Sequence, residues 1–174
     1  MKKKIILYLI LVCVVIGGVF LWIEKNKNQK ENDGNNNGVV VKETASFCYY
    51  YFNKTDHGLY DQALLRLNIN GENVSGEFDN YPAGKDSKVG TFEGTVGPLN
   101  QETTGRTASL WWNSLTRGRQ VKEELNIEFG DSNASALYGE MIDRGDGVYV
   151  YKDKTQMFFG PSLSQISCES PEFK

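Results

Sequence analysis

The chain has 174 residues, of which 40% are hydrophobic, and its 19 Lys and Arg against 22 Asp and Glu give a formal net charge of −3. Residues 46–174 alone carry twelve basic and eighteen acidic residues, a net charge of −6. An acidic domain lacks the basic surface that binds phosphate backbones, so we expect no nucleic-acid partner.

The first element is an apolar segment, residues 5–23 (IILYLILVCVVIGGVFLWI), which follows Lys2, Lys3 and Lys4. Its 19 uncharged residues approach the ~20 that cross the ~30 Å hydrocarbon core of a bilayer. A cleavable signal peptide has a shorter apolar region, roughly 7–15 residues, and a small-residue cleavage site. We therefore predict that residues 1–23 form one transmembrane helix that anchors the chain. A processed leader is the alternative.

The orientation of this anchor is predicted from its flanks and from two later cysteines. Three lysines lie on each side of the apolar segment, so the lysine count favours neither orientation. The free amino terminus and the immediate lysine cluster favour a cytoplasmic N-terminus, and Cys48 and Cys168 suit an oxidising compartment. We expect a single-pass protein of the cell membrane with its C-terminal domain outside the cytoplasm.

Residues 24–45 separate the anchor from the rest of the chain. They contain six asparagines, no aromatic residue and few large apolar residues. Such a segment cannot bury enough surface to offset the loss of chain entropy on folding. The sequence therefore predicts a disordered tether over 24–45 and a single extracytoplasmic domain over 46–174.

That domain begins with SFCYYYF (46–52) and continues as short strands separated by turns. In a strand, Phe47, Tyr49 and Tyr51 face one way and Cys48, Tyr50 and Phe52 the other, so both faces are apolar. Asn-Gly at 70–71 marks a hairpin, and NSLTRGR (113–119), GDSN (130–133) and DRGDG (143–147) mark further turns. The other strands are expected at 63–69, 74–78, 88–96, 106–112, 121–129, 135–141, 147–153 and 155–159. This spacing is typical of an antiparallel barrel or sandwich.

Two segments are ambiguous between helix and strand, residues 59–66 and VKEELNIEF (121–129). In the second, Val121, Leu125 and Ile127 alternate with polar residues at a period of two, which favours a strand. Glycines inside several expected strands permit the sharp coiling that a small barrel needs.

Cys48 lies at the start of the domain and Cys168 near its end. In a barrel the first and last strands are neighbours, so the two cysteines can approach within the ~5.5 Å between Cα atoms that a disulfide requires. Two buried free thiols are the alternative. With the disulfide, one face of 46–52 fills the barrel and the other is expected to lie under MFFGPSLSQI (157–166).

Several stretches carry a family resemblance in a fixed order. They are CYYYFNKTD (48–56), LRLNINGENVSGEF (65–78), GKDSKVGTFEGTVG (84–97), LYGEMID (137–143) and VYVYKD (148–153). Together they resemble a family of uncharacterised exported bacterial lipoproteins and membrane-anchored proteins. The resemblance implies a small calycin- or lipocalin-like β-barrel and supplies no catalytic or ligand-binding residues.

This sequence departs from that family at two places. The apolar segment lacks a lipoprotein cleavage site, because Val12 before Cys13 is bulky and the segment continues for ten residues beyond it. In addition, NSLTRGRQVKEE (113–124) replaces a segment that is usually richer in serine and acidic residues.

The sequence contains few candidate catalytic or metal-binding residues. His57, the only histidine, lies in the polar turn DHG and has no recognisable partner for acid–base catalysis. Asp143, Asp146 and Asp153 lack the spacing of a calcium loop, and Arg144-Gly145-Asp146 fits a turn between strands. We expect no catalytic, metal or cofactor site.

One surface is a candidate interaction patch, formed by Trp111, Arg117, Arg119 and Lys122. Trp112 is in phase with Ala108 and Leu110, so it should fill the interior and leave Trp111 outside. An exposed aromatic with clustered basic residues suits a protein partner or an anionic glycan. The alternative is an ordinary solvated hairpin.

The sequence thus predicts an anchored extracytoplasmic β-barrel that acts as a non-enzymatic binding or interaction module of the cell envelope. One alternative is a carrier that holds a small apolar ligand inside the barrel, since barrels of ~8 strands just admit one. An envelope enzyme is the third. The expected partners are the membrane and an envelope protein, a glycan or a small apolar ligand.

Overall fold

The computed structural model describes residues 44–101 and 104–173. The predicted anchor (1–23) and all but the last two residues of the predicted tether (24–45) lie outside these ranges, so both stay predictions. Within the described ranges no helix has the length and apolar character to cross a membrane.

The described residues form strands and two short 3-10 helices, and the predicted strand periodicity accounts for most of them. Both ambiguous segments are strands, because residues 59–66 and 121–129 lie almost entirely in β2 and β6. The strands are β1 (Thr44–Lys54), β2 (Tyr60–Asn70), β3 (Asn73–Tyr81), β4 (Lys88–Val96), β5 (Arg106–Thr116), β6 (Arg119–Phe129), β7 (Asn133–Tyr138), β8 (Met141–Asp143), β9 (Val148–Tyr151), β10 (Phe158–Phe159) and β11 (Leu163–Ile166), and the 3-10 helices are η1 (Lys154–Gln156) and η2 (Pro171–Phe173).

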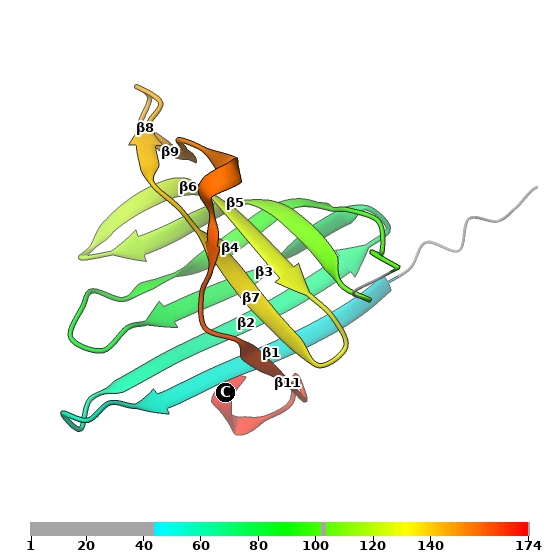
Figure 1. The fold of residues 1–174 in the computed structure, drawn as a ribbon, viewed down its shortest axis with the longest axis horizontal. Helices are drawn as coiled ribbons and strands as arrows, with labels where there is room; N and C mark the ends of the chain where they lie inside the picture. The colour runs from blue at the N-terminus through cyan, green and yellow to red at the C-terminus, as the bar shows by residue number, and fades with distance from the viewer. Residues whose placement is uncertain (1–43, 102–103, 174) are drawn as a thin grey trace, which may run out of the picture. The chain divides into compact units, whose positions relative to one another are not determined.

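Eight of these strands close into an antiparallel barrel (Figure 1). β1 to β7 pair in sequence order, and β11 completes the circuit by pairing with both β7 and β1. Each strand of the circuit therefore has a neighbour on both sides, which removes the exposed edges of an open sheet. The predicted all-β antiparallel barrel is confirmed.

Inward-facing apolar side chains fill one end of the barrel, which we call the closed end. Tyr49, Leu67 and Ile127 are fully buried there, and the Tyr49 hydroxyl donates a hydrogen bond of 2.8 Å to the carbonyl of Gly130. The Phe47 and Phe129 rings pack at 6.0 Å between centroids. The chain enters the barrel at this end, at Thr44.

Two glycines show how tightly the sheet coils. A Cβ atom at Gly76 would overlap the carbonyl oxygen of Arg66 on β2, and one at Gly94 would overlap the carbonyl oxygen of Ser109 on β5. Neighbouring backbones thus approach more closely than a side chain permits. The expected role of these glycines in barrel coiling agrees with this geometry.

The turn expected over 113–119 is much shorter than predicted. β5 continues to Thr116 and β6 starts at Arg119, so only Arg117 and Gly118 connect them, with φ values of 49° and 74°. Two residues with positive φ form the tight turn whose twist matches that of antiparallel strands. The strand expected at 155–159 is also largely wrong, because Lys154–Gln156 form η1.

The segment after β7 forms a hairpin, β8–β9, that projects from one side of the barrel (Figure 1). β9 pairs with β6 in parallel through Lys122 and Glu123, and β8 pairs only with β9. The turn between β8 and β9 contains Arg144-Gly145-Asp146, where the Asp143 carboxylate accepts a hydrogen bond of 2.7 Å from the Gly145 N–H.

The predicted disulfide is confirmed, with 5.1 Å between the Cα atoms of Cys48 and Cys168. Tyr49 is buried on the inner face of β1, as expected. The prediction that residues 157–166 cover the outer face is wrong, because β11 pairs edge to edge with β1 instead of lying over it. On that outer face Cys48 is buried, whereas Phe52 is 52% exposed.

Candidate functional site

The end of the barrel opposite Thr44, which we call the mouth, has a different lining from the closed end. There the inward-facing positions of β4, β5 and β6 hold polar side chains: Lys88, Ser114 and Glu123. These residues follow the same inward phase as Phe92 and Trp112 deeper in the barrel. The interior therefore changes from apolar to polar toward the mouth.

A cavity of about 360 Å³ opens at the mouth. Its size is within the ~300–1,000 Å³ typical of small-molecule sites. The cavity is lined by Trp112 and Leu125 from inside the barrel. The β8–β9 hairpin contributes Met141 and Tyr151 to its lining. A second cavity of about 290 Å³ lies beside it and shares lining residues with it, among them Tyr138.

An ion pair between Lys88 and Glu123 lies in the first cavity. The Lys88 Nζ atom donates to both carboxylate oxygens of Glu123, at 2.7 and 2.8 Å. The same Nζ atom lies 5.8 Å from the centroid of the Trp112 ring. The side chain of Glu123 is 10% exposed and that of Lys88 37% exposed, so the carboxylate is the more deeply desolvated partner.

Two buried polar atoms at the mouth have no hydrogen-bond partner among the described residues, Trp112 Nε1 and Ser114 Oγ. Both side chains are at least 97% buried. A buried donor without an acceptor costs about 1–3 kcal/mol, so such atoms are uncommon and call for an explanation. Trp112 lines the cavity, where the oxygen atom of a ligand would be an acceptor.

The tyrosines of the mouth are held in their neutral form. Burial and the nearby Glu123 carboxylate raise the pKa of Tyr138, whose hydroxyl accepts a hydrogen bond of 3.4 Å from the Asn80 amide. Burial also raises the pKa of Tyr151 to about 12, and its hydroxyl donates to the Leu137 carbonyl at 2.7 Å. Neutral phenol groups suit binding through hydrogen bonds and ring contacts.

The four residues of the predicted interaction patch lie on β5, on β6 and in the turn between them. Trp111 and Lys122 lie on the outer face of the barrel, with the Lys122 Nζ atom 5.7 Å from the centroid of the indole ring. Arg117 lies in the β5–β6 turn and forms an ion pair of 2.6 Å with Asp86, and Arg119 is exposed at the start of β6. Of the basic residues of the predicted patch, Arg117 is therefore paired with an acidic residue, and the patch stays a prediction.

Catalytic and metal sites were not expected from the sequence. The described residues contain no cluster of three or more His, Cys, Asp or Glu side chains that could hold a metal ion. His57 lies in the β1–β2 turn, where the Gly58 N–H donates to the Thr55 carbonyl at 2.9 Å. Two charged groups of the cavity, Lys88 and Glu123, form an ion pair. The cavity is also lined by Lys85, Asp86 and Glu124.

The sequence contained a signal for the mouth that the patch prediction did not use. Glu123 shares the inward phase of Val121 and Leu125, and Lys88 shares that of Phe92. A charged residue at an inward position is uncommon unless it is paired or functional. The comparisons with known proteins add no further assignment: no family model, no curated protein and no solved structure matches this chain.

Proposed function

We propose that this protein is a non-enzymatic binding module of the cell envelope, and that the mouth of its barrel binds a small amphipathic molecule. The observation that carries the proposal is the cavity of about 360 Å³ in which a partly buried ion pair lies beside a buried indole N–H that lacks an acceptor among the described residues. Such a cavity, mostly apolar with a few fixed polar groups, is the usual form of a small-molecule site.

The lining suggests the chemistry of the ligand. A ring or short hydrocarbon would pack against Trp112, Leu125 and Tyr151, and an oxygen atom would accept hydrogen bonds from Trp112 Nε1 and from Lys88. The closed end is filled by buried side chains such as Tyr49 and Leu67. The ligand would therefore occupy the mouth and not the whole length of the barrel.

The location and the finer fold assignment belong to the same proposal. The apolar segment 5–23 supports a single membrane anchor, and the Cys48–Cys168 disulfide supports an oxidising compartment outside the cytoplasm. The closed circuit of eight antiparallel strands, seven of them paired in sequence order, supports a calycin-like barrel and the resemblance to exported bacterial proteins.

Binding can be tested with a matched pair of tryptophan substitutions at the end of β5. Thr116 lines the cavity, whereas Leu115 next to it is 46% exposed. Native mass spectrometry of the full chain, extracted from its membrane, should show a bound small molecule. Thr116→Trp should remove it because the indole fills the mouth, and Leu115→Trp should retain it. The proposal fails if no molecule is bound or if Thr116→Trp retains it.

A protein partner that contacts the exposed Arg119 is the second candidate function. It is favoured by the exposure of Arg119 beside the β5–β6 turn. Pull-down from envelope extracts with wild-type protein and with Arg119→Ala tests it. An unchanged set of captured proteins would reject this candidate.

A further inference from the structure

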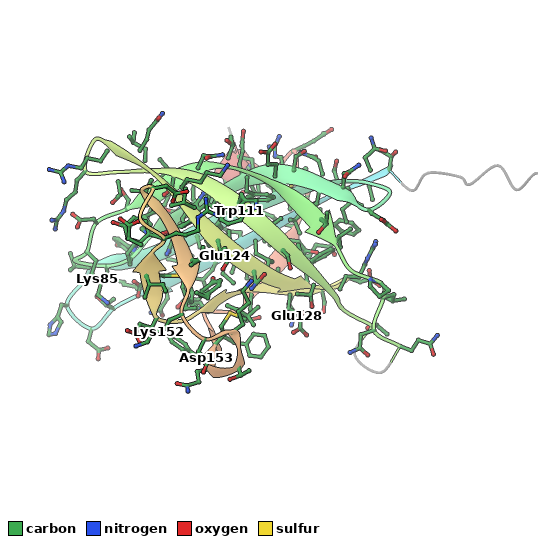
Figure 2. All side chains as sticks on the ribbon, turned by 90° about the horizontal axis from the view of Figure 1, so that it is seen from above. Lys85, Trp111, Glu124, Glu128, Lys152 and Asp153 are labelled. Atoms are coloured by element: carbon green, nitrogen blue, oxygen red, sulfur yellow. A yellow bond between two sulfur atoms is a disulfide. The ribbon has the colours of Figure 1, made fainter. Side chains whose placement is uncertain are left out.

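A groove of about 740 Å³ lies on the outside of the barrel, across β2 to β6. Trp111 on β5 and Glu124 on β6 are part of its surface, and Lys154 of η1 forms the boundary next to β6. Figure 2 shows Trp111 and Glu124 on this side of the barrel, near the segment of Lys152 and Asp153. The groove lies on the outer face of the barrel, whereas the mouth cavity faces the barrel interior, and Glu124 lies at the border of both.

The strand register aligns the outward side chains of this groove in two rows that cross five strands. With neighbouring strands ~4.8 Å apart, each row extends over about 19 Å. The first row consists of Asn68, Ser75, Glu93, Trp111 and Glu124, and the second row of Asn70, Asn73, Thr95, Ser109 and Asn126.

The second row is uncharged, and all of its side chains are short amides or hydroxyls. A row of only uncharged side chains is found in the groove but not in the neighbouring row of the same sheet. The next outward row toward the mouth contains Arg66, Glu77 and Lys122, which are charged. Neutral donors and acceptors in a continuous row are therefore a property of the groove and not of the whole outer surface.

The two carboxylates of the first row flank Trp111. Glu124 forms an ion pair of 2.9 Å with Lys154 and accepts a hydrogen bond of 3.0 Å from the Tyr151 N–H. Glu93 has no ion-pair partner within residues 44–101 and 104–173. Carboxylates on both sides of the indole disfavour an anionic ligand, and they are good acceptors for hydroxyl groups.

The indole of Trp111 is positioned by its neighbours. Lys122 lies on its mouth side, where the Nζ atom is 5.7 Å from the ring centroid, and Ser109 and Asn126 lie on its groove side. The ring is half-buried at the edge of a row of amides. A flat apolar ring beside paired donors and acceptors fits the apolar C–H face and the hydroxyl edge of a sugar ring.

From this arrangement we propose that the groove binds a neutral oligosaccharide, with Trp111 packing against a sugar ring and the uncharged row hydrogen-bonding its hydroxyl groups. A protein partner fits less well, because protein interfaces have an apolar core and Trp111 is the one large aromatic residue of the groove. The site is independent of the ligand proposed for the mouth.

The test uses the full chain in lipid nanodiscs, because glycoside detergents would compete for the groove. Linear tetrasaccharides of glucose and of N-acetylglucosamine are titrated by calorimetry. We expect at least one of them to bind, and Trp111→Ala to weaken that binding on the order of tenfold or more, as for a residue at the centre of an interface. Near-ultraviolet circular dichroism verifies that the variant keeps the packing of Trp112.

A steric pair on β5 localises the binding. Ser109→Arg fills the groove and should abolish binding, whereas Thr107→Arg, also outward on β5 but outside the groove, should leave it unchanged. Phe52→Ala, which removes an exposed aromatic ring on β1, should also bind normally. The proposal is overturned if neither tetrasaccharide binds, or if Ser109→Arg binds as well as Thr107→Arg. Thr116→Trp at the mouth should not change sugar binding.

Discussion

Lys88 and Glu123 form an ion pair whose two members differ in their access to water. Lys88 Nζ lies 2.7 and 2.8 Å from the two carboxylate oxygens, but its side chain is 37% exposed against 10% for Glu123. Removal of the lysine leaves a buried carboxylate without a partner. Removal of the carboxylate leaves an ammonium group that water can still reach. The pair is thus asymmetric in energy.

This asymmetry predicts unequal effects of two substitutions. Lys88→Met should destabilise the domain by about 3 kcal/mol, because an unpaired buried carboxylate is costly. Glu123→Gln should cost about 1 kcal/mol, because the amide oxygen can still accept from Lys88. Urea unfolding at pH 7 measures both. Equal losses, or a larger loss for Glu123→Gln, would contradict the asymmetry.

Alkaline unfolding should depend on Tyr151. Burial raises its pKa to about 12 from the ordinary tyrosine value of 10, so the unfolded state loses this proton first as pH rises. Its contribution is complete below pH 10 and declines from there through pH 12. Tyr151→Phe should be less stable than wild type at pH 8 by about 1 kcal/mol, for the lost bond to the Leu137 carbonyl. The difference in the free energy of unfolding between wild type and Tyr151→Phe should be smaller at pH 11 than at pH 8. A difference that does not change with pH would contradict the raised pKa of Tyr151.

The disulfide should make a large contribution to stability. Cys48 and Cys168 are separated by 120 residues, and closing so long a loop stabilises a fold by at most about 5 kcal/mol in the chain-entropy model. Reduction should add two daltons to the mass and lower the urea midpoint. It should also release the segment that brings the Phe173 ring to 5.1 Å from the Arg66 guanidinium. An unchanged mass on reduction would exclude the bond.

The close approach of β2 and β3 makes Gly76 intolerant of a side chain. Gly76→Ala should cost about 3 kcal/mol or more, because the added methyl overlaps the Arg66 carbonyl and the Phe92 ring. Gly97→Ala is the matched control, since its Cβ would lie 3.5 Å from the Thr107 carbonyl, an ordinary contact. Thermal unfolding compares the two, and similar melting temperatures would argue against so close an approach of the two backbones.

The sequence by itself determined the strand content and the inward phase of most strands. Alternation at a period of two identifies β6 despite its helix-forming residues, and it places Trp112 inside and Trp111 outside. The pairing of Cys48 with Cys168 was also predictable, because a closed barrel makes its first and last strands neighbours. These features depend only on the alternation of apolar and polar residues along each strand and on the closing of the sheet into a barrel.

Only the tertiary structure decided where the candidate sites lie. Lys88 and Glu123 are 35 positions apart and meet because the register of β4, β5 and β6 brings both to the mouth. Arg117 forms an ion pair with Asp86, and it lies in a turn of two residues instead of the seven that were expected. The uncharged row of the groove also exists only through pairing across five strands. A side chain's phase is a local property, but its neighbours across a sheet depend on register, which long-range closure sets.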